Sequence, residues 1–390
     1  MAASSLWPGL PIDLLYDISC RLHDAGDYVR LHAVCKAWRG ASPPAAPAFL
    51  PWLLARSDHG DRTAGCAFAA MPFHPSSRHH RRILKVDRTP PVFSGRDGTV
   101  CSGFDLPRSA PAAAVLPRYS DENEIRSWVD GAIGRVSGDG TILLYAWVVP
   151  KLRVPYPTQP NLNMAIVRPG NTVWKFMTRY DPTRAYGDKG GRDQCCVVYH
   201  SGRIVLCKGT NWRIWSAQGE DDHRWHGKLP YDPDNIFQSG YLVETRGELL
   251  WVSVWLSHQY FEHRDLEKAP PSVSVYSMQE HGARGSASPS PWKKRDCRSL
   301  ALADRVLFLG NPISFAVDAS QCGMMGGCAY FILHRKRQCP QLIKYGLDDG
   351  SVEPLEELPK DFRSKDCTWL TPKPVIDSIK LSHDDVQLMY

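Results

Sequence analysis

The sequence has no uninterrupted apolar stretch near the roughly 18 residues that a membrane-spanning helix needs. Its first residues lack the basic segment of a secretory signal, and Pro8, Pro11 and Asp13 interrupt the apolar residues that follow. The 12 cysteines have no regular spacing, and many lie inside apolar runs, where a reduced thiol acts as a small hydrophobic group. We therefore expect a soluble protein of a reducing compartment, cytoplasmic and/or nuclear, with no membrane partner.

A strong charge of either sign is also missing, because the net charge is only +6 over 390 residues. Three basic clusters, at residues 78–82, 293–295 and 334–337, contain no interleaved aromatic residues. A nucleic-acid-binding domain usually concentrates its basic residues on one face. We expect these clusters to be solvated loops, and we expect no nucleic-acid partner.

The sequence patterns of catalytic and metal sites are absent as well. No HExxH, HxxEH or CxxC pattern supports a zinc site, no GxSxG pattern supports a hydrolase, and Gly187–Asp193 lacks the Lys-Ser/Thr end of a phosphate loop. Carboxylate pairs stand only in turn-like stretches, where aspartate is common for backbone reasons: Asp221-Asp222, Asp232 with Asp234, and Asp348-Asp349. We expect no catalytic residue, no metal and no cofactor, and we keep a glycoside hydrolase that uses two carboxylates as a further alternative.

What is present is the composition of a folded chain, with 43% hydrophobic residues and 13 tryptophans. At 390 residues the chain exceeds one small domain, so we expect one large unit and one small one. The patterning indicates a helical module at 7–40, a Pro/Ala-rich connector at 41–64, a β-rich domain at 65–375 and a C-terminal tail at 376–390.

The stretches 10–22 and 27–39 have the periodicity of two amphipathic helices. Apolar residues recur at helical spacing, namely Leu14, Leu15, Ile18 and Leu22 in the first and Leu31, Val34, Cys35 and Trp38 in the second. A helical pair of this size cannot bury both stripes, so either the rest of the chain or another protein must cover them. The connector favours another protein, because it would hold the helices away from the main body.

Beyond the connector, short runs of β-forming residues replace the helical pattern. Glycines precede four of the leading runs, as turn residues should: Gly140, Gly202, Gly247 and Gly327. The runs pair in chain order, as 141–149 with 172–177, 203–207 with 211–216, 248–255 with 272–278, 305–309 with 313–317, and 328–333 with 341–346.

The spacing of these runs is typical of a β-propeller. Gly202 and Gly247 stand 45 residues apart, which matches the period of a four-stranded blade. The leading runs are nearly continuous in apolar residues, as in strands buried on both faces, whereas a β-sandwich would show alternation. The sequence therefore predicts a mainly β protein with a small α N-terminal module, in which the large domain is a propeller of about six or seven blades.

The N-terminal helices resemble a known module. The resemblance rests on a Leu-Pro opening and a Val-Cys-Lys-Ala-Trp-Arg close at the right separation: Leu10, Pro11, Asp13, Leu14, Leu15, Ile18, Arg21 and Leu22, then Val34–Arg39. These residues look like an F-box, the module through which substrate receptors attach to a Skp-family adaptor and a cullin ubiquitin ligase. The resemblance implies that the adaptor covers the apolar residues of the module: Leu10, Pro11, Leu14, Leu15, Ile18, Leu22, Leu31, Val34, Cys35 and Trp38.

The remainder of the chain resembles the large plant family of F-box proteins whose C-terminal domain, formerly of unknown function, is thought to form a β-propeller. The matching stretches are Phe49–Leu54, Leu309–Asn311, Ser314–Val317, Gly327–Phe331, and Trp369 near Pro372.

By this resemblance the chain is a non-catalytic substrate-recognition adaptor. Its module would dock on the Skp-family adaptor and cullin scaffold, and its propeller would hold an unknown target protein near the transfer enzyme. The alternative is a propeller that binds a carbohydrate or small ligand, with the helices packed on it. In either case we expect loops between strands to form the recognition face, with Trp212 and Trp292 as candidates for it.

Overall fold

The computed structural model describes residues 10–22, 25–35, 38–39, 49–56, 65–70, 82–86, 93–94, 100–101, 133–148, 161–171, 174–180, 195–218, 225–230, 232–259, 269–279, 290–296, 300–311, 313–333, 339–358 and 367–371. The helices among them are α1 (Ile12–Cys20), α2 (Ala25–Ala33), α6 (Leu300–Ala303) and α7 (Ala319–Cys322). None of the helices in these ranges is long and apolar enough to cross a membrane.

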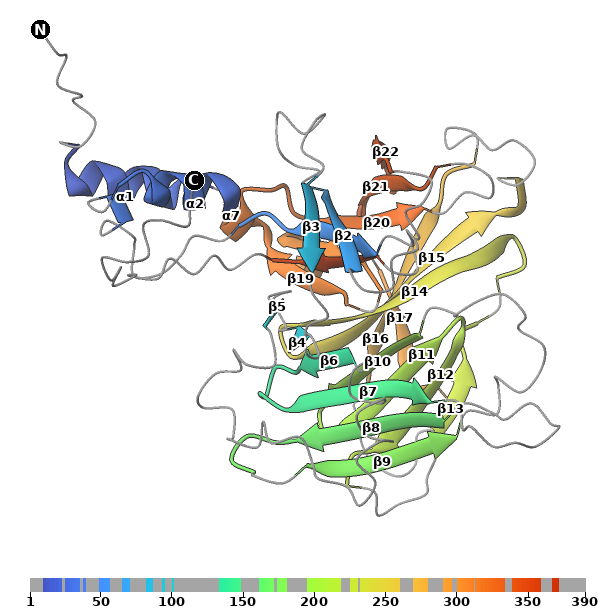
Figure 1. Cartoon of the computed structure of the whole chain (residues 1–390). Helices are drawn as coiled ribbons and strands as arrows, with labels where there is room; N and C mark the ends of the chain where they lie inside the picture. Colours follow the sequence, from blue (N-terminus) through green and yellow to red (C-terminus); the bar gives the residue numbers. More distant parts are fainter. Residues whose placement is uncertain are drawn as a thin grey trace, which may run out of the picture.

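The described strands form five sheets (Figure 1). The closing sheet has the order β23 (Cys367–Leu370), β1 (Trp52–Arg56), β2 (Gly65–Ala70), β3 (Arg82–Val86). The second sheet has the order β5 (Val100–Cys101), β4 (Phe93–Ser94), β6 (Ile133–Val136), β7 (Ile142–Val148), β8 (Asn161–Val167), β9 (Lys175–Tyr180).

The other three sheets follow along the chain. The third sheet contains β10 (Cys195–His200), β11 (Arg203–Lys208), β12 (Asn211–Ser216) and β13 (Trp225–Lys228). The fourth contains β14 (Asn235–Thr245), β15 (Glu248–Ser257), β16 (Ser272–Met278) and β17 (Trp292–Arg295). The fifth has the order β19 (Phe315–Asp318), β18 (Arg305–Phe308), β20 (Cys328–Leu333), β21 (Gln341–Gly346), β22 (Val352–Glu357). Pairing is antiparallel except between β4 and β6 and between β18 and β20.

Neighbouring sheets pack face to face through four apolar cores. The cores join the closing sheet to the fifth, the fifth to the fourth, the fourth to the third, and the third to the second. Alternate side chains of one strand are buried in two different cores. Trp251 of β15 faces the third sheet, whereas Leu250 and Val252 face the fifth. At the inner edges, β14 lies against both β10 and β19. Sheets stacked in series around a shared axis are the architecture of a β-propeller.

The β10–β11 and β14–β15 hairpins have two-residue turns. Ser201 and Gly202 have φ values of 47° and 78°, and Arg246 and Gly247 have values of 48° and 79°. Positive φ at both central positions defines the turn type whose twist matches a hairpin, and glycine adopts it without steric cost. The predicted turn role of these glycines is confirmed.

Four of the five predicted strand pairs are confirmed, namely β11 with β12, β15 with β16, β18 with β19, and β20 with β21. The first pair is wrong, because β8 lies between β7 and β9. The sequence did not indicate β8 as a strand, because two of its first three residues are asparagines.

The described residues make five sheets, whereas the sequence predicted about six or seven blades. The larger number came from dividing the length by one short period. Two of the sheets contain more than four strands, so they use more of the chain than that period allows. Strand β1 also lies inside the stretch 41–64, which the sequence assigned to a connector, yet it pairs with both β2 and β23.

The closing sheet joins the two ends of the domain. Leu53 of β1 pairs with Trp369 of β23, and both side chains are fully buried against the fifth sheet. The Trp369 indole Nε1 donates to the Leu309 carbonyl oxygen at 3.1 Å, and its ring lies 5.1 Å from that of Phe308. A strand from the C-terminal part therefore completes a sheet that the N-terminal part began.

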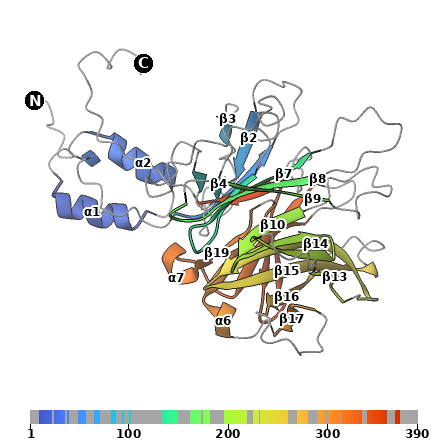
Figure 2. The ribbon, with the colours of Figure 1, turned by 90° about the horizontal axis from the view of Figure 1, so that it is seen from below.

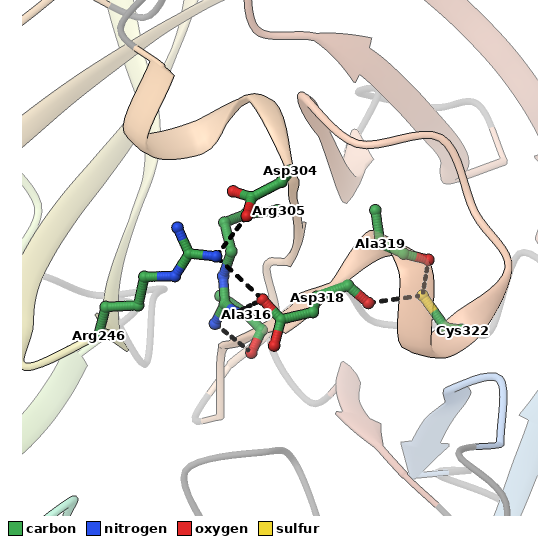
Figure 3. A network of polar contacts seen from close by, with 7 residues as sticks. All are labelled: Arg246, Asp304, Arg305, Ala316, Asp318, Ala319 and Cys322. Atoms are coloured by element: carbon green, nitrogen blue, oxygen red, sulfur yellow. Dashed lines mark hydrogen bonds and ion pairs between the residues drawn. The ribbon is translucent and has the colours of Figure 1, made fainter.

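A polar network ties the β14–β15 turn to the fifth sheet (Figure 3). Arg246 in the turn donates to Asp304 and, at 3.2 Å, to Asp318. Arg305 also donates to Asp318, and its other amino group donates to the Ala316 carbonyl oxygen. The hydrogen bond from Arg246 lowers the pKa of the Asp304 carboxyl below its ordinary value. Because Arg246 and Asp304 are exposed, we expect this network to fix the turn's position more than it adds stability.

Replacing Trp369 tests the closing sheet. Trp369→Ala should lower the free energy of unfolding by about 3–5 kcal/mol, because it empties a buried site and removes a hydrogen bond. Chemical denaturation monitored by circular dichroism measures the loss. Trp225→Ala, which truncates a half-buried tryptophan on the outermost strand β13, is the matched control and should cost less. Equal losses would contradict the role given to Trp369.

Buried acids predict a loss of stability at alkaline pH. Burial raises the pKa values of the Cys196 and Cys207 thiols and of the Tyr145 and Tyr330 hydroxyls. The unfolded chain releases these protons from about pH 8.5 for cysteine and about pH 10 for tyrosine, whereas the folded chain retains them. The free energy of unfolding should therefore fall above about pH 8.5, by up to about 1.4 kcal/mol per pH unit for each group.

Urea unfolding at pH 7.5, 9 and 10.5 under a non-thiol reductant measures this dependence. Cys207→Val removes one titrating group, so its stability should decline less steeply between pH 8.5 and 10 than that of the parent protein. A free energy of unfolding that stays constant from pH 7.5 to pH 10.5 would contradict the prediction.

Candidate functional site

The two N-terminal helices form a small module with its own core. Leu15 of α1 packs against Trp38, and both are buried. Leu10, Leu31 and Cys35 are partly buried around them. Pro11 begins the module, and its carbonyl oxygen accepts hydrogen bonds from the backbone N–H groups of the first turn of α1. The module therefore holds its shape through side chains from both helices and the segment after them.

A buried polar chain crosses the same module. Ser19 of α1 and His32 of α2 are joined by a hydrogen bond of 2.9 Å between Ser19 Oγ and His32 Nε2. The other ring nitrogen of His32 lies 2.8 Å from the Trp38 carbonyl oxygen. Both side chains are almost completely buried, and a buried polar pair stabilises only the arrangement that satisfies it. This chain sets how α1, α2 and the segment at Trp38 sit against one another.

The module also packs on the start of the closing sheet. Tyr28 of α2 is buried edge-on against Phe49, with ring centroids 5.2 Å apart. Leu22 and Trp52 of β1 pack around that pair. Figure 2 shows the two helices beside the sheets on one side of the molecule. The expectation that the connector holds the helices off the main body is therefore corrected, because aromatic side chains bridge the two.

Five other apolar side chains of the module are exposed to solvent. Among the described residues, seven large apolar side chains are exposed, and five of them belong to this module: Ile12, Leu14, Tyr16, Val29 and Val34. The other two are Ile236 and Met325. Leu14 is 46% exposed and Val34 is 59% exposed. We call these five side chains the apolar surface of the module. Exposed apolar side chains are thus concentrated in residues 12–34.

The structure divides the predicted docking residues into three groups. Pro11, Leu14 and Val34 are exposed, whereas Leu10, Ile18, Leu22, Leu31 and Cys35 are partly buried. Leu15 and Trp38, which the sequence assigned to the same docking set, are buried and pack against each other inside the module. Ile12, Tyr16 and Val29 are also exposed but were not among the predicted residues, although the i, i+4 spacing of Ile12 and Tyr16 is a sign of a shared helical face.

A second concentration of polar groups lies at the inner edges of the sheets. Arg135 of β6 extends across the axis and donates from Nη2 to the carbonyl oxygens of Leu242 and Ser314, at 3.2 and 3.1 Å. Burial lowers the pKa of its guanidinium, whereas the phenol of Tyr145, the thiol of Cys196 and the carboxylate of Glu244 raise it. Even with a lowered pKa, an arginine stays charged at neutral pH. We call these residues, with His200, the axial cluster.

Glu244 is held at the outer end of the axial cluster. Its two carboxylate oxygens accept the Gly138 backbone N–H at 3.3 and 3.2 Å. Its Oε1 lies 3.7 Å from His200 Nδ1. The β6–β7 turn, β10 and β14 thus meet around this carboxylate, which draws three sheets together at one end of the axis.

The tryptophans proposed for a recognition face lie in the core instead. Trp212 and Trp292 are buried between the third and fourth sheets, where the Trp292 ring lies 5.2 Å from that of Trp251. Trp215 is buried between the second and third sheets. The expectation of a tryptophan recognition face is therefore corrected. These residues fill the wide spaces between twisted sheets.

Two of the three carboxylate pairs lie among the described residues and bond to their own turns. Asp232 accepts the Asp234 backbone N–H and the Asn235 side-chain amide, each at 3.0 Å. Asp349 accepts the Ser351 backbone N–H at 2.9 Å, and this hydrogen bond lowers the pKa of the Asp349 carboxyl. Asp221-Asp222 lies outside the described residues. Within the described ranges, no group of three or more His, Cys, Asp or Glu side chains is arranged to hold a metal ion.

Comparison with known proteins identifies the large domain. The model of a family described as KIB1-4 beta-propeller matches residues 146–358. Similar solved structures include Penicillium chrysogenum alpha-L-arabinanase complexed with arabinobiose, at 9% identity and a TM-score of 0.26, covering 77% of this chain and 76% of that chain. They also include Bacillus subtilis levansucrase, at 9% identity and a TM-score of 0.21, covering 84% of both chains. Likenesses this weak carry no argument about function. No curated protein matches the chain.

Two adjacent leucines test the division between the module's core and its surface. Leu15→Ala should destabilise the module by about 2–5 kcal/mol, because Leu15 is buried. Leu14→Ala should change its stability by about 0.5 kcal/mol or less, because Leu14 is exposed. Amide hydrogen exchange across α1 and α2 in the full chain measures both effects. Similar exchange rates in the two variants would show that the assignment of core and surface is wrong.

Proposed function

Because the chain belongs to the KIB1-4 β-propeller family, we propose that it is the substrate-recognition subunit of a Skp-cullin-F-box ubiquitin ligase. In this proposal the helical module docks on a Skp-family adaptor, and the propeller binds the target protein. The chain itself carries no catalytic residue, because ubiquitin transfer takes place on another subunit of the assembly.

The observation that carries the proposal is the apolar surface of the module. Its five side chains remain in water although the same module buries Leu15 and Trp38. Exposed apolar area of this kind favours association, because covering it releases roughly 25 cal/mol for each Å² removed from water. The F-box resemblance of residues 10–39 gives the kind of partner, a helical adaptor that receives the module.

The module's core supports the proposal in a second way. A docking surface is effective when its side chains are already in position, because less freedom is lost on binding. Here Leu15, Trp38 and the Ser19–His32 hydrogen bond fix α1 against α2 before any partner arrives. We infer that the buried residues of the F-box pattern shape the surface, and that Leu14, Val34 and their exposed neighbours contact the adaptor.

The contact between module and propeller suits a receptor that presents a target. Tyr28, Phe49 and Trp52 join α2 to β1, so the propeller keeps a defined orientation to the module. A ligase acts by proximity, and a defined orientation raises the effective concentration of target lysines at the transfer enzyme. A freely hinged receptor would lose part of that gain.

Charged substitutions on the apolar surface test the docking step. Leu14→Asp and Val34→Asp should each weaken binding of a purified Skp-family adaptor by about tenfold or more, because each places a charge in an apolar contact. Isothermal titration calorimetry with the full chain measures the affinity. Both positions are exposed, so the melting temperature should stay near that of the parent protein.

Met325→Asp is the matched control, because Met325 is the most exposed large apolar residue outside the module in the described part of the chain. It should bind the adaptor like the parent protein. The docking proposal fails if the parent chain does not bind the adaptor, or if Met325→Asp weakens binding as much as Val34→Asp does.

The alternative function, a propeller that binds a carbohydrate or small ligand, stays a prediction. It requires a ligand-dependent rise in melting temperature without any adaptor present. A glycan panel screened by thermal denaturation of the full chain separates it from the adaptor function, because adaptor binding acts through the module and not through the propeller.

A further inference from the structure

Arg135 places a buried positive charge where four of the described sheets converge. Its own strand, β6, belongs to the second sheet, and its Nη2 bonds to Leu242 O in the fourth sheet and Ser314 O beside the fifth. Cys196 of the third sheet is close enough to interact with it electrostatically. A charge at this place is costly unless a partner balances it.

The guanidinium is only partly satisfied. Its Nη1 atom is buried and has no hydrogen-bond acceptor among the described residues. Arg135 forms no ion pair with a described carboxylate. The Glu244 carboxylate interacts with it electrostatically, but the Glu244 oxygens accept the Gly138 N–H and lie near His200. Two carbonyl oxygens receive its other amino group, but carbonyl oxygens carry no net charge to offset the guanidinium.

A second unsatisfied donor lies beside it. Leu143 of β7 is directly opposite Arg135, so Tyr145 is the diagonal neighbour on the same face of the sheet. Tyr145 is only 1% exposed, and its hydroxyl finds no hydrogen-bond acceptor in the described part of the chain. The backbone at Val197 approaches the hydroxyl oxygen, which leaves the O–H proton still to be donated.

We propose that the propeller axis binds a small oxyanion, a phosphate or carboxylate group, through Arg135 Nη1 and the Tyr145 hydroxyl. Two donors without acceptors, one of them charged, favour an acceptor with negative charge. A water molecule would satisfy the hydrogen bonds but add no charge to that of Glu244, which interacts with the guanidinium without forming an ion pair. Arg135 as a whole keeps some exposure to solvent.

Anion titrations of the purified full chain test the site. Inorganic phosphate and acetate, each compared with chloride at matched ionic strength, should raise the melting temperature in a saturable manner if they occupy it. The relative size of the two responses identifies the group, because phosphate and carboxylate share the donors but differ in charge and shape. Isothermal titration calorimetry gives the dissociation constant.

Two substitutions assign the response to these residues. Tyr145→Phe keeps the buried ring and removes only the hydroxyl, so it should fold normally and weaken anion binding by about tenfold or more. Arg135→Gln should abolish binding. Tyr276→Phe, on β16 between the third and fourth sheets, is the matched control and should bind like the parent protein.

The proposal is overturned if neither anion gives a saturable response, or if chloride gives the same rise at equal ionic strength. It is also overturned if Tyr145→Phe responds like Tyr276→Phe. The two orphan donors would then be satisfied by trapped water. Because Tyr145→Phe retains the packing of the parent side chain, the test does not depend on whether Arg135→Gln folds.

Discussion

The third, fourth and fifth sheets of this molecule have apolar side chains on both faces, and such a sheet is stable only where a neighbour covers each face. Leu250 and Trp251 of β15 are adjacent in the chain, yet they are buried in different cores on opposite sides of one sheet. In a row of such sheets, the first and the last sheet each have one apolar face that no neighbour in the row covers. The closing sheet, in which β23 pairs with β1, provides the cover for the fifth sheet through Leu53 and Trp369.

This requirement also explains why polar groups gather at the inner edges. Strands that converge on an axis bring their carbonyl oxygens together where no apolar side chain has room, and those oxygens need donors. Arg135 of the second sheet donates hydrogen bonds to two of them, the carbonyl oxygens of Leu242 and Ser314. Elsewhere along the inner edges, the Glu244 carboxylate accepts the backbone N–H of Gly138 and lies close to His200. The apolar cores bind neighbours in pairs, whereas these polar groups connect several sheets at once.

Local patterns were enough to predict those features that depend on neighbouring residues. Gly202 and Gly247 were assigned to turns because each precedes a leading apolar run, and both have the positive φ that the twist of a hairpin favours. The continuous apolar runs indicated strands buried on both faces, as in β15. Strand β14 was missed because Gln238, Ser239 and Gly240 interrupt its pattern, at the place where the pairing with β15 shifts its register. Its burial comes from contact with two other inner strands, which no local pattern records.

Local patterns also failed to predict which residues of the candidate sites are buried. Leu14 and Leu15 are alike in type and adjacent in the chain, and helical periodicity placed both in one apolar stripe, although only Leu15 meets Trp38. Arg135 stands alone in the short strand Ile133–Val136, and a single arginine in such a strand is usually solvated. Its burial results from the convergence of sheets whose strands are more than 100 residues away in the chain. Contacts beyond the local pattern, and not composition, decided which of these side chains are buried.

The closing sheet also determines the orientation of the helical module relative to the propeller. Phe49 and Trp52 attach α2 to β1. The position of β1 is fixed by pairing with β2 on one side and with β23 on the other. The C-terminal strand thus supports the segment on which the N-terminal helices rest. Loss of β23 would leave the module's own core intact, since Leu15, Trp38 and the Ser19–His32 hydrogen bond do not touch it. The link that orients the module would lose its support, so in the proposed function docking and target presentation would depend on different contacts.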